Sequence, residues 1–381
     1  MRKRHETFGG IVAGDDPPFL AFVDRDTMRQ LGAGESPLWD TACTDIDLLS
    51  APTEVHISVT NRCSVGCDHC YMGAGEPDPH EMDTDTFKKA LAELAHMGVF
   101  HIAMGGGEAL LREDLFVLAR HARELGLIPN LTISGVGLTP EKLKQMTVFG
   151  QVNVSLDGIG PLYQVCRGRD LWDQAHTALE RLIQSGIPGG INCVLSQANY
   201  SGLKDLFAYA KEVGANEIEF LRFKPSGRGR AHYEQNRLTH EQHIELVPCL
   251  TALSQTYGIV AKIDCSFVPM LCYHTPPREL LDKLCTYGCE AGNVLVGVRS
   301  NGIVSGCSFL EPTDLSVFDL AQQWQGSAAL TACRRFSAHI AEPCASCAYL
   351  SVCKGGCHAV SAFVTGDVTA PDPECPWVVE G

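Results

Sequence analysis

Residues 51–258 alternate between short apolar runs and longer stretches in which apolar residues recur every three or four positions. The first pattern predicts buried strands, and the second predicts amphipathic helices that cover them. The predicted strands are Val55–Thr60, Phe100–Met104, Ile128–Ile133, Val152–Leu156, Gly190–Leu195 and Glu217–Leu221. The predicted helices lie near Thr84–His96, Glu113–Leu125, Pro140–Met146, Trp172–Gln184, Leu203–Val213 and Thr239–Tyr257. Good N-caps such as Asp83 and Thr139 precede helices, and glycines such as Gly214 follow them.

Repetition of strand and helix is typical of βαβ units around a parallel sheet, so the predicted fold class is α/β. Six such units would form a partial (β/α)6 barrel, TIM-like but short of the eight strands of a closed one. Sheets of this kind bind their ligands at the carboxyl ends of the strands. The residues that directly follow each strand are therefore the first candidates for a site.

The two ends of the chain lack this alternation. Residues 1–50 predict a hairpin, in which Phe8–Ala13 pairs with Phe19–Val23 across residues 14–17, and a short helix near Thr27–Leu31. Beyond the barrel, Gly, Pro and Cys replace the helical periodicity. We expect such a segment to bury little core, so that metal would have to supply folding energy. The predicted division is an N-terminal extension (1–50), a barrel (51–258) and a small cysteine-rich domain (259–381).

Composition narrows the class of protein. The 381 residues include 18 cysteines, and the formal net charge of −15 argues against a broad nucleic-acid surface, which needs a basic face. No apolar run approaches the roughly 20 residues of a membrane helix, and the first residues lack the apolar region of a secretory signal. The expected location is the cytoplasm, where cysteines more often bind metal or act in catalysis than form disulfides.

Three cysteines, Cys63, Cys67 and Cys70, stand on one short loop directly after the first predicted strand. Three thiolates cannot complete a tetrahedral zinc site, but they can hold a 4Fe–4S cluster that keeps one iron open. The spacing Cys-x3-Cys-x2-Cys, followed by Tyr71, resembles the radical S-adenosylmethionine (SAM) superfamily. In that family the open iron binds SAM, and an electron from the cluster cleaves it to a 5′-deoxyadenosyl radical. The alternative is a zinc knuckle that takes a fourth ligand from elsewhere in the chain.

The resemblance implies further SAM contacts. Gly106, Gly107 and Glu108 follow the second predicted strand, where glycines let the backbone approach a ligand and a carboxylate can accept from an ammonium group. They match the family's Gly-Gly-Glu segment, which holds the SAM amine. Ala109 stands where the family usually has proline, a small departure that leaves the implied mechanism intact.

Ser155, Asp157 and Arg167 follow the fourth predicted strand and resemble the segment that contacts the ribose and carboxylate of SAM; Tyr71 joins this set. A plain turn after a strand is the alternative for Ser155 and Asp157. His69 lies between two ligands, and we expect it on the solvent side. A basic group after the sixth strand would either clamp a carboxylate or an acidic peptide, or lie in a solvated loop. Its members are Arg222, Lys224, Arg228 and Arg230.

A second cysteine pattern reads Cys285-x3-Cys289-x12-Gly302-x4-Cys307, then Cys344-x2-Cys347-x5-Cys353-x3-Cys357, then Cys375. Eight thiolates suffice for two fully ligated clusters. The pattern resembles the SPASM extension of radical SAM enzymes, which carries two auxiliary 4Fe–4S clusters. The resemblance implies that cluster I takes Cys285, Cys289, Cys307 and Cys357, and that cluster II takes Cys344, Cys347, Cys353 and Cys375.

Some assignments in this region stay open. The family often varies at the position of Cys285, and Cys265 and Cys272 are nearby competitors. Two four-cysteine zinc sites are the alternative to two clusters, because Cys-x2-Cys is also typical of zinc. Seven cysteines fall outside the predicted ligand sets: Cys43, Cys166, Cys193, Cys249, Cys265, Cys272 and Cys333. Cys193 and Cys249 are expected to pack as small apolar residues, and Cys166 either packs or acts as a radical or thiol donor near the mouth of the site.

The resemblance implies an iron–sulfur oxidoreductase that uses three 4Fe–4S clusters and SAM, with an electron donor such as flavodoxin or ferredoxin. SPASM relatives mostly crosslink, oxidise or decarboxylate ribosomally made peptides or proteins, which favours a peptide maturase. One alternative substrate is a small molecule such as a tetrapyrrole side chain. Another alternative, a sulfatase maturase, is disfavoured because those enzymes carry an acidic base where this chain has Ser308. A scaffold without catalysis would have no use for Gly105–Glu108.

The residues before the barrel add one hint about partners. Arg4–Val12 and Phe22–Asp24 resemble the first hairpin of the small peptide-recognition domain found in or beside peptide maturases. Only the hairpin and one helix fit before the barrel, so a complete leader-peptide domain would come from a separate protein. The alternative is a hairpin that only packs on the barrel.

Overall fold

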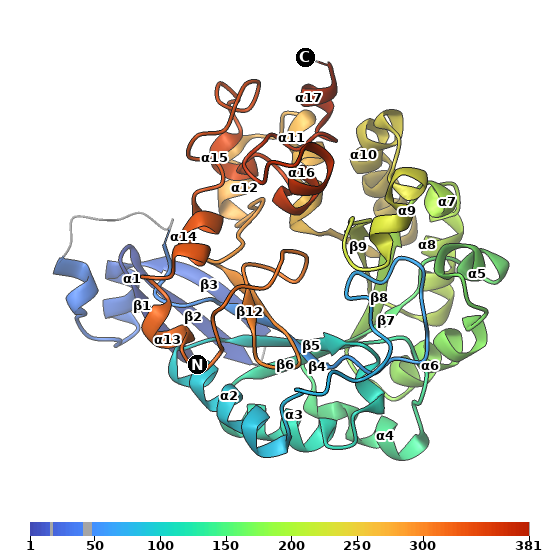
Figure 1. Cartoon of the computed structure of the whole chain (residues 1–381), viewed down its shortest axis with the longest axis horizontal. Helices are drawn as coiled ribbons and strands as arrows, with labels where there is room; N and C mark the ends of the chain where they lie inside the picture. The colour runs from blue at the N-terminus through green and yellow to red at the C-terminus, as the bar shows by residue number, and fades with distance from the viewer. Residues whose placement is uncertain (16–17, 41–47, 381) are drawn as a thin grey trace.

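The computed structural model describes residues 1–15, 18–40 and 48–380. Asp16 and Pro17 of the predicted hairpin turn, and the spare cysteine Cys43, lie outside the described residues. Strands and helices alternate along a parallel sheet, as Figure 1 shows, which confirms the predicted α/β class.

The barrel follows the predicted order of strands and helices. Its elements are β4 (Glu54–Thr60), α2 (Thr84–His96), β5 (His101–Gly106), α3 (Leu115–Glu124), β6 (Ile128–Ile133), α4 (Pro140–Gln145), β7 (Val152–Ser155), α6 (Trp172–Gln184), β8 (Gly189–Leu195), α8 (Leu203–Val213), β9 (Glu217–Arg222) and α10 (His240–Tyr257). Shorter helices lie in the connections: α5 (Pro161–Arg167), α7 (Gln197–Tyr200) and α9 (Gly229–Asn236). The predicted caps form as well, since the side chains of Asp83 and Thr139 accept from the backbone N–H of Thr86 and Lys142.

Three strands from beyond residue 258 extend the sheet, whose order is β10-β9-β8-β7-β6-β5-β4-β11-β12. The strand β10 (Val260–Ile263) pairs in parallel with β9, and β11 (Leu295–Val298) pairs in parallel with β4. The short strand β12 (Val304–Ser305) turns back antiparallel to β11. Gly302 lies in the turn between these two strands with φ +85°, a conformation that favours glycine and explains its place in the cysteine pattern.

The expectation that the C-terminal region buries little core is wrong. Val296 and Val298 of β11, together with Trp324, are at most 2% exposed and belong to the same core cluster as the barrel strands. The reason is that β11 takes the edge position beside β4, which an incomplete barrel leaves open. The helices of the C-terminal region are α11 (Val268–Tyr273), α12 (Arg278–Lys283), α13 (Leu320–Gln323), α14 (Ala328–Arg334), α15 (Leu350–Cys353), α16 (His358–Thr365) and α17 (Pro376–Glu380). In Figure 1 most of them lie across the sheet from α2, α3 and α4.

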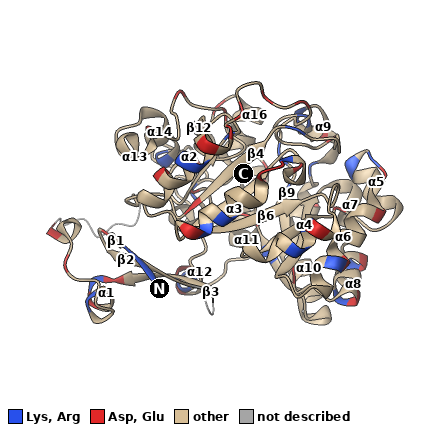
Figure 2. Ribbon diagram, turned by 90° about the horizontal axis from the view of Figure 1, so that it is seen from below, with Lys and Arg blue, Asp and Glu red and all other residues tan. Residues whose placement is uncertain are grey.

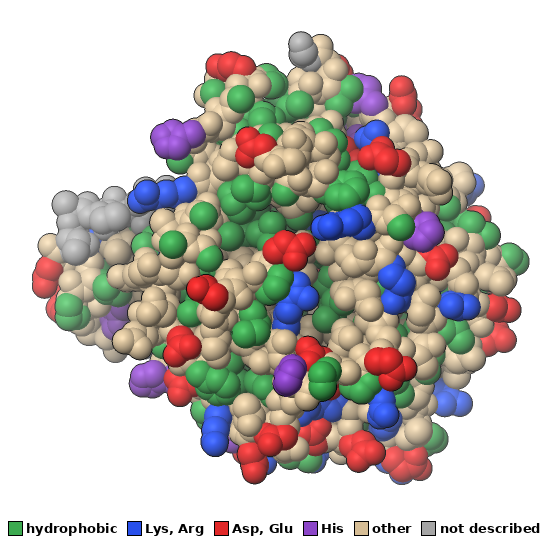
Figure 3. Space-filling model, in the orientation of Figure 1, with side chains coloured by type: hydrophobic (Ala, Val, Ile, Leu, Met, Phe, Trp, Pro, Cys, Tyr) green, Lys and Arg blue, Asp and Glu red, His purple; other side chains and the backbone are tan. Residues whose placement is uncertain are grey.

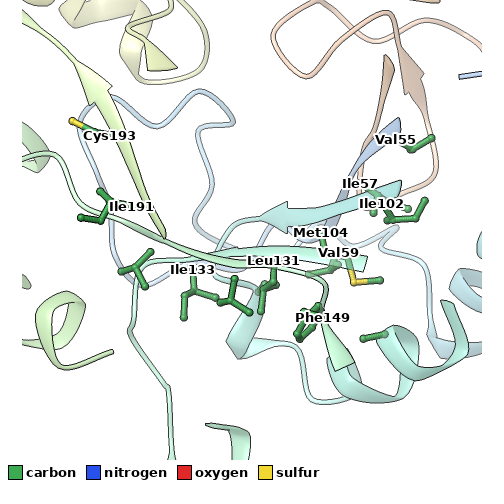
Figure 4. Packing of buried hydrophobic residues seen from close by; sticks show 14 of the residues in the cluster. Val55, Ile57, Val59, Ile102, Met104, Leu131, Ile133, Phe149, Ile191 and Cys193 are labelled. Atoms are coloured by element: carbon green, nitrogen blue, oxygen red, sulfur yellow. The ribbon is translucent and has the colours of Figure 1, made fainter. Parts of the chain in front are cut away.

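Apolar side chains from neighbouring strands build the barrel core. Val55 and Ile57 of β4 and Ile102 and Met104 of β5 are at most 1% exposed, and Figure 4 shows them close together on adjacent strands. The outer helices carry charged residues of both signs (Figure 2). Among the described residues, no helix combines the length and apolar character needed to cross a membrane.

The N-terminal region forms an antiparallel sheet of β1 (Arg2–Glu6), β2 (Gly9–Asp15) and β3 (Pro18–Asp24), followed by α1 (Arg25–Gln30). The predicted hairpin corresponds to β2 and β3 and is confirmed. The strand β1 was not predicted, because a run of basic and acidic residues gives no apolar alternation.

A buried arginine of β1 fastens this sheet to the barrel. Arg4 is 8% exposed and donates to the carbonyl oxygens of Ala51 (2.7 Å), Pro52 (2.8 Å) and Gly98 (3.0 Å). Its Nε also pairs with Glu6 at 2.7 Å. The guanidinium therefore satisfies three backbone acceptors and one buried carboxylate at once.

Replacing Arg4 by methionine is expected to lower the free energy of unfolding by about 3 kcal/mol, because it leaves a buried carboxylate without its cation. Urea unfolding at neutral pH measures the loss. The matched control is Arg29→Met, since Arg29 pairs with Asp26 and Glu35 at the surface and exposed pairs contribute little. Equal losses in the two variants would contradict the anchoring role of Arg4.

Candidate active site

The cysteines of the first pattern lie on a loop that begins where β4 ends. Backbone hydrogen bonds close this loop: the N–H of Cys63 donates to Gly75 O at 2.8 Å, and the N–H of Gly75 donates to Asn61 O at 3.0 Å. Cys63, Cys67 and Cys70 all line one cavity of about 710 Å³. The loop therefore presents three thiols to a common space.

The segment after β9 supports the cysteine loop. Arg228 donates through Nε to Cys67 O at 2.9 Å and through Nη1 to Ala74 O at 2.7 Å. Its own N–H donates to Cys70 O at 2.9 Å. The basic group was expected either to clamp an acidic partner or to lie in a solvated loop. Arg228 does neither, because it holds the backbone of the cysteine loop.

Asp157 and Arg167 hold the thiol of Cys67. Arg167 donates through Nη1 to Asp157 Oδ2 at 2.6 Å and through Nη2 to Cys67 Sγ at 3.2 Å. The other oxygen of Asp157 accepts from the N–H of Val194 at 2.7 Å. Burial lowers the pKa of His69, whose Nε2 lies 3.3 Å from Asp157 Oδ2. The expectation that His69 faces solvent is wrong, since the cysteine loop folds over the end of β7 and leaves that side chain 10% exposed.

Hydrogen bonds within the chain fix the segment Gly107–Glu108, which follows β5. Glu108 is 1% exposed, and its carboxylate accepts from the N–H groups of Leu110 (3.1 Å) and Ser134 (2.9 Å). Burial raises the pKa of Glu108. A Cβ on Gly107 would lie 2.2 Å from Arg62 O, so glycine is required there by the close approach of the cysteine loop. That this segment also holds the SAM amine stays a prediction.

Gly107→Ala is expected to displace the cysteine loop and to lower the iron bound per chain, because the added methyl overlaps a backbone carbonyl. Iron analysis of anaerobically purified protein measures this. Gly105→Ala is the control for folding and iron content, since a Cβ there meets nothing within 4 Å. Full iron loading of the Gly107 variant would contradict the packing argument.

A column of side chains joins the cysteine loop to the second cysteine pattern. The ring of Tyr71 lies 4.9 Å from that of Phe309, and Lys224 Nζ lies 4.3 Å from the same Phe309 ring. Lys224 also forms a buried ion pair with Asp264. It was expected either to clamp an acidic partner or to lie in a solvated loop, and instead it pairs with a carboxylate of its own chain. Phe309 stands two residues after Cys307. These contacts therefore join the cysteine loop, through Tyr71, to the segment that carries Cys307, along one side of the cavity.

Three of the cysteines predicted for cluster I, Cys289, Cys307 and Cys357, line the same cavity as the cysteine loop. The fourth differs from the prediction. Cys265 and Cys285 are both exposed, but Cys265 lines this cavity and Cys285, just beyond α12, does not. The donor set on this wall is again four thiols, which suits an iron–sulfur cluster.

The four cysteines predicted for cluster II surround a separate cavity of about 350 Å³. They are Cys344, Cys347, Cys353 and Cys375. Cys272 lines the same cavity, and apolar side chains such as Trp377 complete its wall. A dry, thiol-lined space of this kind also fits an iron–sulfur cluster.

A buried ion-pair network connects the last barrel strands to these cysteines. Arg222, at the end of β9, donates to both oxygens of Asp372 (2.6 and 2.9 Å) and to Glu374 (2.8 Å). Asp372 in turn accepts from the N–H of Cys357 at 2.8 Å. The Arg222 side chain is 2% exposed, so the expected solvated loop is wrong for it; it does clamp carboxylates, but those of its own chain. Arg230, 58% exposed, does lie on the surface.

Comparison with known proteins decides the family. The sequence model of the radical SAM superfamily matches residues 57–210. Mycofactocin maturase MftC of Mycolicibacterium smegmatis is 30% identical over 344 residues, which cover 87% of this chain and 84% of that protein. The chain belongs to the radical SAM superfamily. It is accordingly a radical SAM enzyme that binds SAM and a 4Fe–4S cluster.

Other relatives of this radical SAM enzyme agree. PqqA peptide cyclase of Ruegeria pomeroyi is 31% identical over 339 residues, which cover 85% of this chain and 87% of that protein. The structure of Streptococcus suis SuiB bound to its precursor peptide SuiA has a TM-score of 0.77 and covers 98% of both chains, at 16% identity. The likeness in fold covers 98% of the chain and so includes the cysteine-rich segment.

One part of the wall of the radical SAM cavity is polar. His56 Nδ1 lies 3.4 Å from Ser308 Oγ, and His56 Nε2 lies 3.3 Å from Glu54 Oε1. Glu219 accepts a long hydrogen bond (3.5 Å) from Asn153 Nδ2. In Figure 3 hydrophobic side chains gather across the middle of the molecule, between the C-terminal segment and the barrel. The cavity thus combines a polar inner wall with an apolar approach.

Of two other predicted site residues, Ser155 lines the cavity and Cys166 does not. Ser155 lines the cavity, as expected for a residue at the end of β7. Cys166 is not among the lining residues; burial raises the pKa of its thiol to about 12, and Ser196 is its hydrogen-bond partner. This placement does not support a role for Cys166 as a thiol or radical donor.

Sequence reasoning missed the polar wall, and it named Cys265 only as a competitor of Cys285 for cluster I. The alternation Glu54-Val55-His56-Ile57 in the first strand is the signal that could have revealed the wall, because every second side chain faces the barrel interior. Cys265 follows β10, a strand that was not predicted. The partners of Arg222 come from about 150 residues further along, and no local pattern announces them.

Proposed function

We propose that this radical SAM enzyme is a peptide maturase, which abstracts hydrogen from a ribosomally made peptide or protein and so gives a crosslink, an oxidation or a decarboxylation. Its relatives by sequence are named as a mycofactocin maturase and a PqqA peptide cyclase, and SuiB was solved with a precursor peptide. Peptide maturation is the function that the geometry of the cavity supports best.

The observation that carries the proposal is the shared cavity. The thiols of the cysteine loop and those of Cys289, Cys307 and Cys357 face one space of about 710 Å³. When bound, the cluster and SAM supply a 5′-deoxyadenosyl radical that abstracts a hydrogen atom. The chain's own part is to orient: Arg167 and Arg228 fix the cysteine loop, and the polar wall around His56 and Glu219 meets the polar groups of the peptide.

We assign two auxiliary 4Fe–4S clusters to the second cysteine pattern, one against the large cavity and one in the smaller one. The cluster beside the substrate cavity would take up the electron that an oxidised substrate releases. Zinc would fit four thiols as well, but it could not accept that electron.

The partners follow from the same chemistry. A flavodoxin or ferredoxin would reduce the SAM cluster, in a reducing cytoplasm. In residues 1–15 and 18–40 the structure describes three strands, the helix α1 and one 3-10 turn (Pro37–Asp40), and we propose that a separate protein carries the leader-peptide domain. Arg4 ties this sheet to the barrel, so it would present any bound leader at a fixed place.

The proposal is tested by incubating the anaerobically reconstituted enzyme with SAM, dithionite and short peptides encoded beside its gene. Mass spectrometry then follows 5′-deoxyadenosine and the peptide together. We expect the 5′-deoxyadenosine yield to rise with the true peptide, and the mass of that peptide to change. If a tetrapyrrole raised the yield and was modified while every peptide was left unchanged, the peptide-maturase proposal would be wrong.

A further inference from the structure

The large cavity holds a cysteine that the sequence pattern left out. Cys265 lies two residues after the end of β10, at the carboxyl ends of the parallel strands, where the Cys63 loop also starts after β4. Its thiol lines the cavity together with Cys289, Cys307 and Cys357. These four residues come from three separate stretches of the C-terminal segment and converge on one wall.

The thiols on this wall are close enough to influence one another. Burial raises the pKa of the Cys289 thiol, and the Cys265, Cys307 and Cys357 thiols raise it further. For Cys265 the corresponding neighbours are Cys357 and Cys307. Cys265 therefore lies near the other three thiols, and all four line the same cavity, as ligands of one cluster must.

Cys285 has none of these neighbours. It is exposed just after α12 with φ 50°, and Asp282 is the group that raises the pKa of its thiol apart from burial. It lines neither of the two thiol-rich cavities. Its backbone N–H donates to Asp282 O at 3.1 Å, so its backbone is tied to the end of α12.

The surroundings of Cys265 suit a cluster ligand. Asp264 caps the short turn that begins at Cys265 and accepts from Ser266 N–H at 3.2 Å, so the backbone at this position is fixed. Lys224 pairs with Asp264 and lies near the thiols of Cys265 and Cys357. A buried cation beside thiolates offsets part of the negative charge of a four-thiolate cluster.

We propose that Cys265, and not Cys285, is the fourth ligand of the auxiliary cluster against the large cavity, completing the set Cys265, Cys289, Cys307 and Cys357. The assignment rests on the proposed function in one respect, the presence of that cluster. Cys272 stays with the other cavity, as a fifth thiol beside the predicted ligands of cluster II.

The test uses the full chain in which Cys63, Cys67 and Cys70 are all replaced by alanine, so that only auxiliary iron is counted. This protein should hold about eight irons, four for each cubane. Adding Cys265→Ala should remove between one and four of them, depending on whether the cluster loses one corner or is lost entirely. Adding Cys285→Ala is the matched control and should leave about eight.

A second variant separates ligation from folding. Cys265→Ser can offer an oxygen ligand, so we expect it to keep most of the iron but to show an altered EPR signal and a site with a distinct Mössbauer isomer shift. Loss of iron from the Cys285 variant with full loading of the Cys265 variants would overturn the assignment, as would full loading with unchanged spectra in all of them. If the parent protein itself bound zinc instead of iron, the auxiliary clusters would be wrong and not the choice of ligand.

Discussion

Replacing Cys63, Cys67 and Cys70 together by alanine is expected to reduce 5′-deoxyadenosine formation to background while leaving iron at the auxiliary sites. These three thiols line the cavity from one loop, and no other cysteine of the described chain lies on that loop. Without them the SAM-binding cluster has no ligands, so the electron that cleaves SAM has no route to it. The expected change is therefore complete loss and not a slower rate.

The measurement is 5′-deoxyadenosine by liquid chromatography after anaerobic incubation with SAM and dithionite, with iron determined on the same sample. Cys249→Ala is the control, since Cys249 packs against the barrel core from α10 and lines neither cavity. Retained SAM cleavage in the triple variant would refute the assignment of the loop. Loss of all iron would show that the triple change disrupts more than the loop.

Arg222→Met is expected to have the largest effect on stability. Burial alone would raise the pKa of Asp372, but Arg222 and the N–H groups of Cys357 and Glu374 together hold it below its usual value. Removing the guanidinium leaves Asp372 and Glu374 buried without their cation, at a cost of about 3–5 kcal/mol in the free energy of unfolding. Because Asp372 also accepts from the N–H of Cys357, we expect the variant to lose auxiliary iron as well.

Urea unfolding and iron content measure the two effects. Arg230→Met is the matched control, because Arg230 is 58% exposed and its contact with Glu311 at 3.5 Å is a surface pair. We expect that variant to stay within about 0.5 kcal/mol of the wild type. A wild-type free energy of unfolding and full iron in Arg222→Met would show that the network does not join the barrel to the cysteine-rich segment.

The barrel could be predicted from the sequence because its elements have strong local signals. The helix Trp172–Gln184 and the helix Leu203–Val213 have the predicted limits, since each presents an apolar stripe and ends near a glycine. The strands β10 and β11 have four residues each, and apolar runs as short as 259–263 and 294–298 do not by themselves distinguish a strand from other buried segments. Their places in the sheet follow from open edges of the barrel, a tertiary effect.

The candidate site divides in the same way. The spacing of Cys63, Cys67 and Cys70 reflects one loop, and a local pattern is enough to find it. Asp157 and Arg167 were predicted to meet SAM, and their contact with Cys67 depends on how the loop folds across β7. Choosing between Cys265 and Cys285 required knowing which of them faces the cavity, which no spacing rule contains.

The most direct test of the central claim, a radical SAM enzyme with two auxiliary clusters, is metal analysis of the wild-type protein purified without oxygen. Three cubane clusters predict about twelve irons and as many acid-labile sulfides per chain, with zinc near zero. About four irons with two zinc ions per chain would contradict the account, because the second cysteine pattern would then be a pair of zinc sites.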